Sequence, residues 1–161
     1  MADHWRKQLR AAIKAKLTTP ALASVTAANV VTDDEYPDAA GRFPGIHIVI
    51  GASQRRRVGT VNLGGGVQGI EVENACVVKA VILVRQDTGA ADMCDQVSKE
   101  IEARWLATPV DRGLGMQGCR DAELISIEEP VFDTDSDVLT AQQTVQFEVT
   151  VRSFEGRPDQ T

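Results

Sequence analysis

The sequence is poor in the residues from which enzyme active sites and metal centres are usually built. Its 161 residues include two histidines, three cysteines and only 4% aromatic residues. His4 and His47 lie far apart, and no Cys-x-x-Cys or His-x-x-x-His spacing indicates a zinc site. There is no Gly-x-Ser-x-Gly motif, and no pair of carboxylates is marked as buried by its neighbours. The residues therefore indicate no catalytic group and no metal site.

The chain also lacks a basic surplus and a long apolar run. Its net charge of −6 argues against a general nucleic-acid binder, which needs basic residues to displace counterions. No run approaches the roughly 20 apolar residues that span a bilayer, and the charged N-terminus is unlike a signal peptide. We therefore expect a chain made in a cytoplasm. In that compartment Cys76, Cys94 and Cys119 are expected to be free thiols, the first two buried.

The stretch from Ile70 to Ala107 carries the strongest pattern. Residues 76–84 form the most apolar run and are rich in β-branched side chains, which predicts a central strand covered on both faces. Asp87 or Thr88 can cap the helix that follows. Within that helix every fourth residue is apolar, which predicts one stripe that packs against the sheet. The stripe consists of Met93, Val97, Ile101 and Trp105.

Weaker patterns predict the remaining elements and the fold class. Alternation of apolar and polar residues is clearest near the C-terminus and is typical of a half-buried antiparallel strand. Because the strands come in consecutive runs, we predict an α+β fold: a mixed, largely antiparallel sheet of about five strands with two helices packed on it. We expect a single domain over 1–161. The other elements are a helix over 3–17 with Asp3 as its N-cap, and strands over 29–32, 45–51, 123–129 and 140–154.

Residues 52–69 are unusual because they combine Arg55-Arg56-Arg57 with many glycines. Consecutive glycines are costly to order, so we predict a mobile Gly-rich loop, or an extended β-hairpin arm that orders against a partner. A phosphate cradle would need a helix N-terminus after the glycines, and a strand follows instead. The arginines are interpreted either as solvated residues or as a contact for an acidic partner surface.

Two further motifs resemble ligand sites but are better explained otherwise. His47 lies in a predicted strand without a nearby ligand partner, and we interpret it as a partly exposed sheet histidine. Asp133, Asp135 and Asp137 alternate as in a calcium loop. However, the sixth position is not glycine, and the twelfth is Thr144 rather than glutamate. We predict a solvated acidic loop over 131–138.

The order of elements resembles the tail terminator family of long-tailed bacteriophages over residues 3–154. The shared features are loose and non-catalytic: an opening amphipathic helix, a Pro-x-Ile-x-Val/Ile strand, a long apolar strand that leads into a helix with an Ile-Glu pair, and a closing alternating strand. In this chain they correspond to residues 5–13, 44–50, 95–102 for the helix with its Ile-Glu pair, and 142–151. The Gly-rich insert departs from the compact family pattern.

The resemblance implies a structural virion protein rather than an enzyme. Such a protein forms a ring, expected to be a hexamer, that caps the tail tube, ends tube polymerisation and joins the tail to the head connector protein. We expect no cofactor, no metal, no membrane and no sequence-specific nucleic acid, although DNA would pass through the ring. The expected location is the tail or neck of the virion, after synthesis in the host cytoplasm. The residues expected to bind the tail tube or a neighbouring subunit are Arg55, Arg56, Arg57, Gly64, Gly65 and Gly66.

Three alternatives remain open from the sequence. The chain is also compatible with a head–tail connector or completion protein of the neck. A small α+β ligand-binding domain or enzyme would use the Gly-rich segment and would require a pocket near Gly59 to Gly69. The third alternative is an adaptor from another contractile or secretion tube.

Overall fold

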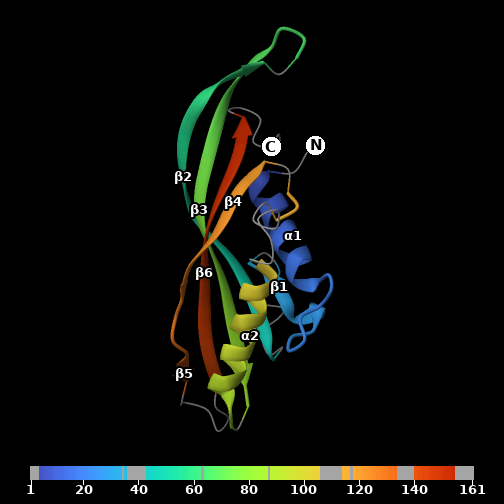
Figure 1. Ribbon diagram of the computed structural model, residues 1–161, viewed down its shortest axis with the longest axis vertical. Coiled ribbons are helices and arrows are strands. Elements are labelled where there is room, and N and C mark those ends of the chain that lie inside the picture. Colours follow the sequence, from blue (N-terminus) through green and yellow to red (C-terminus); the bar gives the residue numbers. More distant parts are fainter. Residues whose placement is uncertain are drawn as a thin grey trace.

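A computed structural model describes residues 4–33, 35, 43–62, 64–86, 88–105, 114–116, 118–133 and 140–154. These residues form two helices and a six-stranded, mostly antiparallel sheet (Figure 1). The predicted α+β class is confirmed, with about the expected number of strands. The helices are α1 (Trp5–Thr18) and α2 (Ala90–Trp105), with a 3-10 turn at Ala27–Asn29. The strands are β1 (Val30–Thr32), β2 (Gly45–Asn62), β3 (Gln68–Arg85), β4 (Cys119–Ile127), β5 (Val131–Asp133) and β6 (Thr140–Phe154).

The sheet is built around the long β2–β3 hairpin. Its strand order is β1-β2-β3-β6-β4, and β5 also pairs with β6. Only β1 and β2 are parallel. Because β3 occupies one side of β6 along its whole length, β4 and β5 must follow one another along the other side. The most apolar strand of the sequence is therefore central, as predicted.

Both helices pack on the same face of the sheet. The buried hydrophobic residues of β2, β3 and β6 belong to one face by their pairing register, and nearly all of them form a single core with the apolar stripes of the helices. The stripe predicted in α2 is confirmed, since Val97, Ile101 and Trp105 are buried and Met93 packs against the core. The α1 helix is capped by the His4 side chain, which accepts a hydrogen bond from the Arg6 N–H at 3.2 Å. Residue 3, the expected cap, lies outside the described residues.

The prediction that the central strand is covered on both faces is wrong. In β3, residues 72 to 84 are buried at every second position, whereas Val77, Val81 and Leu83 between them are partly exposed and Lys79 is exposed. No element among the described residues forms a second layer over this face. β-Branched residues suit a pleated strand whether or not the strand is covered, so the apolar run overstated the burial. The sheet thus has one face that no described element covers, which we call the uncovered face.

Of the two structures predicted for residues 52–69, the structure has the extended β-hairpin rather than the loop, because most of the segment is strand. Pairing with β3 continues to Asn62, and the chain reverses at Gly64, Gly65 and Gly66, which all have positive φ (92°, 61° and 79°). Gly59 lies beside a register shift, and a second shift follows Ile50, as expected for glycine-containing β-bulges. The distal part of this hairpin projects beyond the helices and beyond β6 (Figure 1). We call residues 55–71, which comprise this distal part and its base beside β6, the arm.

The remaining predictions have mixed outcomes. The C-terminal strand has the predicted bounds. Cys76, Cys94 and Cys119, all of them described, form no disulfide, and the first two are buried. The predicted acidic loop over 131–138 is wrong at its start, because β5 pairs Val131–Asp133 with β6; residues 135 and 137 lie outside the described residues. None of the described helices is both long and apolar enough to cross a membrane.

Candidate functional site

The three predicted contact arginines lie on β2 at the base of the arm. All three are exposed, and their partners in the β3 register are Asn74, Glu73 and Val72. Because side chains alternate along a strand, Arg56 lies on the uncovered face, whereas Arg55 and Arg57 lie on the opposite one. The structure therefore does not gather the three arginines into one cluster.

The three predicted contact glycines form the tip of the arm. A Cβ atom on Gly64, Gly65 or Gly66 would meet no described atom within 4 Å, so the turn is open on all sides. Its shape depends on positive φ, and the Gly64 N–H donates a hydrogen bond to the Asn62 side chain at 2.9 Å. A strand follows the turn, so these glycines lack the helix N-terminus that a phosphate cradle requires.

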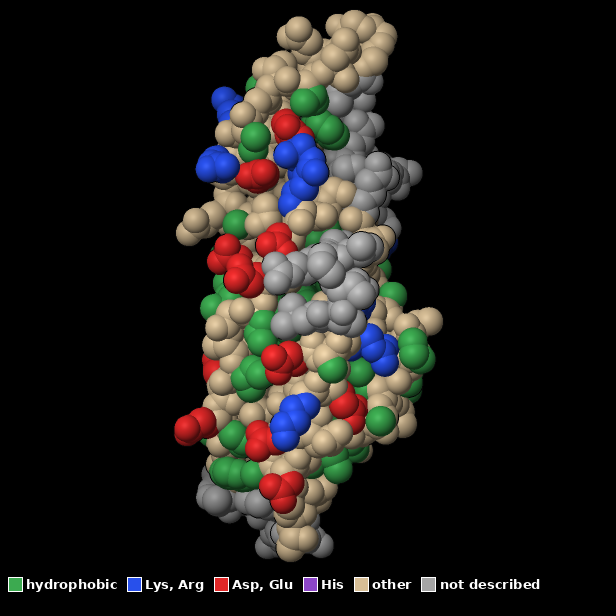
Figure 2. All heavy atoms as spheres, in the orientation of Figure 1, with side chains coloured by type: hydrophobic (Ala, Val, Ile, Leu, Met, Phe, Trp, Pro, Cys, Tyr) green, Lys and Arg blue, Asp and Glu red, His purple; other side chains and the backbone are tan. Residues whose placement is uncertain are grey.

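Ion pairs on the uncovered face connect the arm to the body of the sheet. The Arg152 Nε of β6 lies 2.7 Å from the Glu71 Oε1, and Glu71 is almost fully buried. The Arg56 Nη2 lies 3.2 Å from the Glu73 Oε2, although the Arg56 side chain is 79% exposed. Figure 2 shows basic and acidic side chains side by side on the upper part of the molecule. The Glu71–Arg152 pair therefore holds the arm, whereas Arg56 remains open to a partner.

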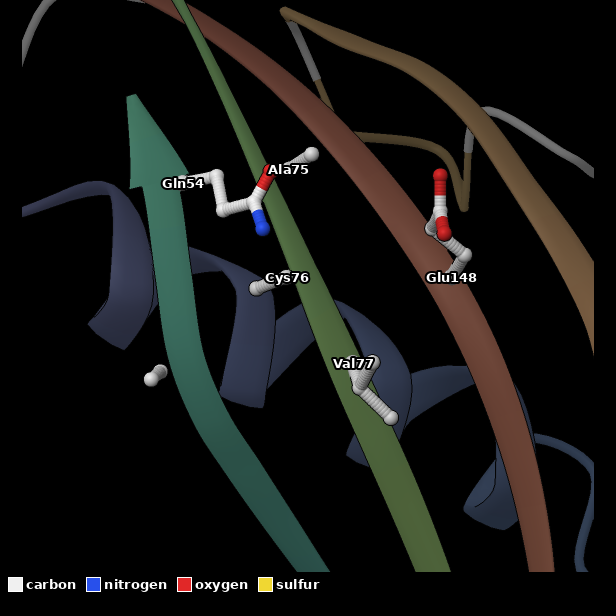
Figure 3. A pocket seen from close by; sticks show the side chains of 6 residues that line it. Gln54, Ala75, Cys76, Val77 and Glu148 are labelled. Carbon is white, nitrogen blue, oxygen red and sulfur yellow. The ribbon is translucent and has the colours of Figure 1, made fainter.

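A hollow of about 160 Å³ lies on the hairpin below the arm. Gln54 of β2 and Glu148 of β6 flank it on either side of β3, and Ala75 and Val77 of β3 lie between them (Figure 3). It forms where β2 shifts register after Ile50. The pocket required by the ligand-binding alternative was expected near Gly59 to Gly69, and this hollow lies closer to the helices than that segment.

Burial shifts the pKa values of Cys76 and His47, two ionisable residues of the sheet. Burial raises the pKa of Cys76, which also lines the hollow, to about 11, so this thiol is protonated at neutral pH.

His47 is half-buried in the sheet, as predicted. Burial lowers its pKa, and the nearby Asp33 carboxylate partly offsets this effect. Within the described ranges no group of three or more His, Cys, Asp or Glu residues could hold a metal ion.

Because its thiols are buried, the folded protein is expected to lose stability at alkaline pH. Burial first, and then the Asp95 carboxylate, raise the pKa of Cys94 from 9.0 to about 11. Between these values the unfolded chain loses the thiol proton while the folded chain keeps it, so the free energy of unfolding falls as pH rises. We expect this fall between pH 8 and pH 10.5 to be smaller in Cys94→Ala by roughly 1–2 kcal/mol, as measured by urea unfolding. An equal fall in both proteins would contradict the raised pKa.

The sequence did not indicate a set of exposed apolar residues on the outer strands. Val131 is 68% exposed and Ile125 is 51% exposed, and Ile127 and Phe132 are also exposed. All four belong to β4 or β5, the strands that border the sheet beyond β6. Exposed apolar groups on an edge strand are a risk for aggregation unless a partner covers them. The only sequence signal was Val131-Phe132 directly after Pro130, within a segment that otherwise reads as an acidic loop.

The described residues present three surfaces: a sheet face that no described element covers, a projecting arm and an apolar edge. These are features through which a protein contacts other proteins. A comparison with protein-family models and with curated protein sequences found no match to this chain.

Proposed function

We propose that the protein is a phage tail terminator: a structural subunit that assembles into a ring on the tail tube, stops tube growth and provides the surface that meets the head connector. The observation that carries the proposal is the combination of a projecting two-stranded arm with exposed apolar residues on the far border of the same sheet. A subunit that has two different contact surfaces can associate head to tail, and such contacts close into a ring when the rotation between subunits is suitable.

The arm has the dimensions and composition of a docking element. Beyond Glu71, β3 has no partner in β6, so the distal hairpin consists of β2 and β3 alone. Two-stranded hairpins are only marginally stable in water by themselves, and contact with a partner compensates for this. Val58, Val67 and Ile70 are exposed on the arm and supply the apolar area that such a contact would bury. In the proposed ring the arm reaches a neighbouring subunit or the tube, and no bond-making step is involved.

The proposal is tested by adding the purified protein to growing polymers of the tail-tube protein encoded in the same genome. We expect substoichiometric amounts to shorten the tubes, because each ring blocks one growing end, and we expect electron micrographs to show a ring at that end. An unrelated acidic protein of similar size serves as the control. Tubes of unchanged length that carry no added protein at their ends would contradict the proposed function.

A further inference from the structure

The sheet has two open borders among the described strands. On one side, β1 pairs with β2 only at residues 46–48, and the Arg6 guanidinium donates a hydrogen bond to the Gly51 carbonyl at 2.9 Å. Beyond this point no described strand pairs with the outer side of β2; we call residues 53–62 the β2 edge. On the other side, β4 and β5 border β6, and we call residues 119–133 the β4–β5 edge. Both edges present backbone groups that can pair with another strand.

Exposed apolar residues gather on the β4–β5 edge and on the arm, whose first strand contains most of the β2 edge. Every large hydrophobic residue that is exposed in the described part of the chain lies either on the arm or on the β4–β5 edge. On the arm these are Val58, Val67 and Ile70, and on the β4–β5 edge they are Ile125, Ile127, Val131 and Phe132. The helices and the rest of the sheet contribute none of them. Apolar exposure confined to the arm and the β4–β5 edge indicates that both are covered in the assembled protein.

The two edges carry opposite charge. The β2 edge contains three arginines and no acidic residue, whereas the β4–β5 edge contains five acidic residues and one arginine. Arg55, Arg56 and Arg57 are exposed, as are Glu123, Glu128 and Glu129. Pairing of one edge with the same edge of another copy would bring like charges together, which opposes it. Pairing of the two different edges brings opposite charges together.

The strand directions allow this pairing to continue the sheet. β2 is antiparallel to β3, β3 to β6 and β6 to β4, so β2 and β4 run in opposite directions. When a second copy is placed beside the first in the same orientation, its β2 lies antiparallel to β4. The helices of both copies then remain on one face of a shared sheet. Antiparallel addition at an edge is a common mode of recognition, in which backbone hydrogen bonds supply affinity and side chains supply specificity.

We propose that the β2 edge of one copy pairs with the β4–β5 edge of the next copy, so that the contact between subunits is a continuous antiparallel sheet. The occupant of each edge is therefore a second copy of this chain. The inference rests on the proposed function insofar as the repeated contact builds the ring. It adds which surfaces meet, in which direction, and why the contact is head to tail rather than two-fold.

Charge reversal at each edge tests the proposal. The first variant is R55E/R56E/R57E, the second is E123R/E128R/E129R, and the third combines all six changes. A matched control, K79E/R85E/K99E, alters the charge by the same amount at exposed positions outside both edges. Self-association is measured by sedimentation velocity over a range of protein concentrations, and by chemical cross-linking of copies bound to tail tubes. Circular dichroism checks the fold, and R55Q/R56Q/R57Q replaces the first variant if that variant does not fold.

We expect each single-edge variant to associate at least about tenfold more weakly than the original protein, because like charges then face each other. The combined variant should recover to within about threefold, since its edges are again opposite in charge, and the control should be unchanged. In a two-fold contact each edge would meet the same edge of another copy, so reversing the second edge could not restore association lost at the first. Recovery in the combined variant therefore excludes a two-fold contact. The proposal is overturned if the original protein associates neither in solution nor on tail tubes. It is also overturned if single-edge reversals leave the association unchanged, or if the combined variant does not recover.

The tube-capping assay on the same proteins separates this inference from the proposed function. If the original protein caps tubes and charge reversal leaves its self-association unchanged, the edge pairing is wrong and the proposed function stands. If the single-edge variants associate more weakly and the combined variant recovers, but the original protein does not stop tube growth, the edge pairing stands and the terminator function is wrong.

Discussion

Replacing Trp105 by alanine is expected to lower the free energy of unfolding by about 3–5 kcal/mol, the range found for large aromatic residues in protein cores. Trp105 is fully buried at the end of α2. Its ring stacks on that of Phe147 in β6, with centroids 3.7 Å apart and planes within 11° of each other. The substitution would therefore remove a stacked ring contact between the last turn of α2 and the sheet. Urea unfolding followed by circular dichroism measures the change.

Two control variants separate this effect from a general effect of substitution. Trp105→Phe keeps an aromatic ring against Phe147 and should lose much less stability. Val131→Ala shortens a side chain that is 68% exposed, so its free energy of unfolding should change by less than about 0.5 kcal/mol. A loss below about 1 kcal/mol in Trp105→Ala would show that α2 is not anchored through this stack.

The apolar periodicity of the sequence was sufficient to predict the core. The four-residue spacing that ends at Trp105 identified the buried side of α2, and the alternation from Val145 to Val151 identified the strand that faces it. Both patterns are local consequences of burying one side of an element, so they can be read without knowledge of the fold. The α+β class followed from the order of these elements.

The exposed surfaces could not be predicted equally well, because the exposure of a strand depends on which elements from other parts of the chain pack beside it. Nothing in residues 76–84 reveals that the second face of β3 lacks a covering layer, since valine suits both situations. Gly59 and the triple glycine suggested either a loop or a hairpin arm, and only the structure shows that they occupy a register shift and a tight turn within a long hairpin. The opposite charges of the two edges are visible in the sequence, but their position at opposite borders follows only from the strand order.

Removing the distal arm is expected to abolish capping of tail tubes while leaving the fold intact. Gly59 pairs with Glu71, so residues 60–70 can be replaced by Asn-Gly, a dipeptide suited to a two-residue hairpin turn. Most of the deleted strand residues are exposed and pair within the hairpin, beyond the end of β6, so little buried surface is lost. We expect the melting temperature to change by no more than about 3 °C. The apparent affinity for tube ends should fall at least about 100-fold, as is typical when the central part of an interface is removed.

A second variant distinguishes the reach of the arm from its apolar character. Val67→Ser with Ile70→Ser keeps the length of the hairpin and the three glycines but removes exposed apolar area. If the arm acts by burying these side chains against the tube or a neighbouring subunit, this variant should lose most of the capping activity that the truncation loses. If the arm acts mainly as a spacer, the serine variant should cap normally while the truncated protein does not. Normal capping by the truncated protein itself would show that Gly64, Gly65 and Gly66 are not contact residues, and would confine recognition to Arg55–Arg57 and the body of the sheet.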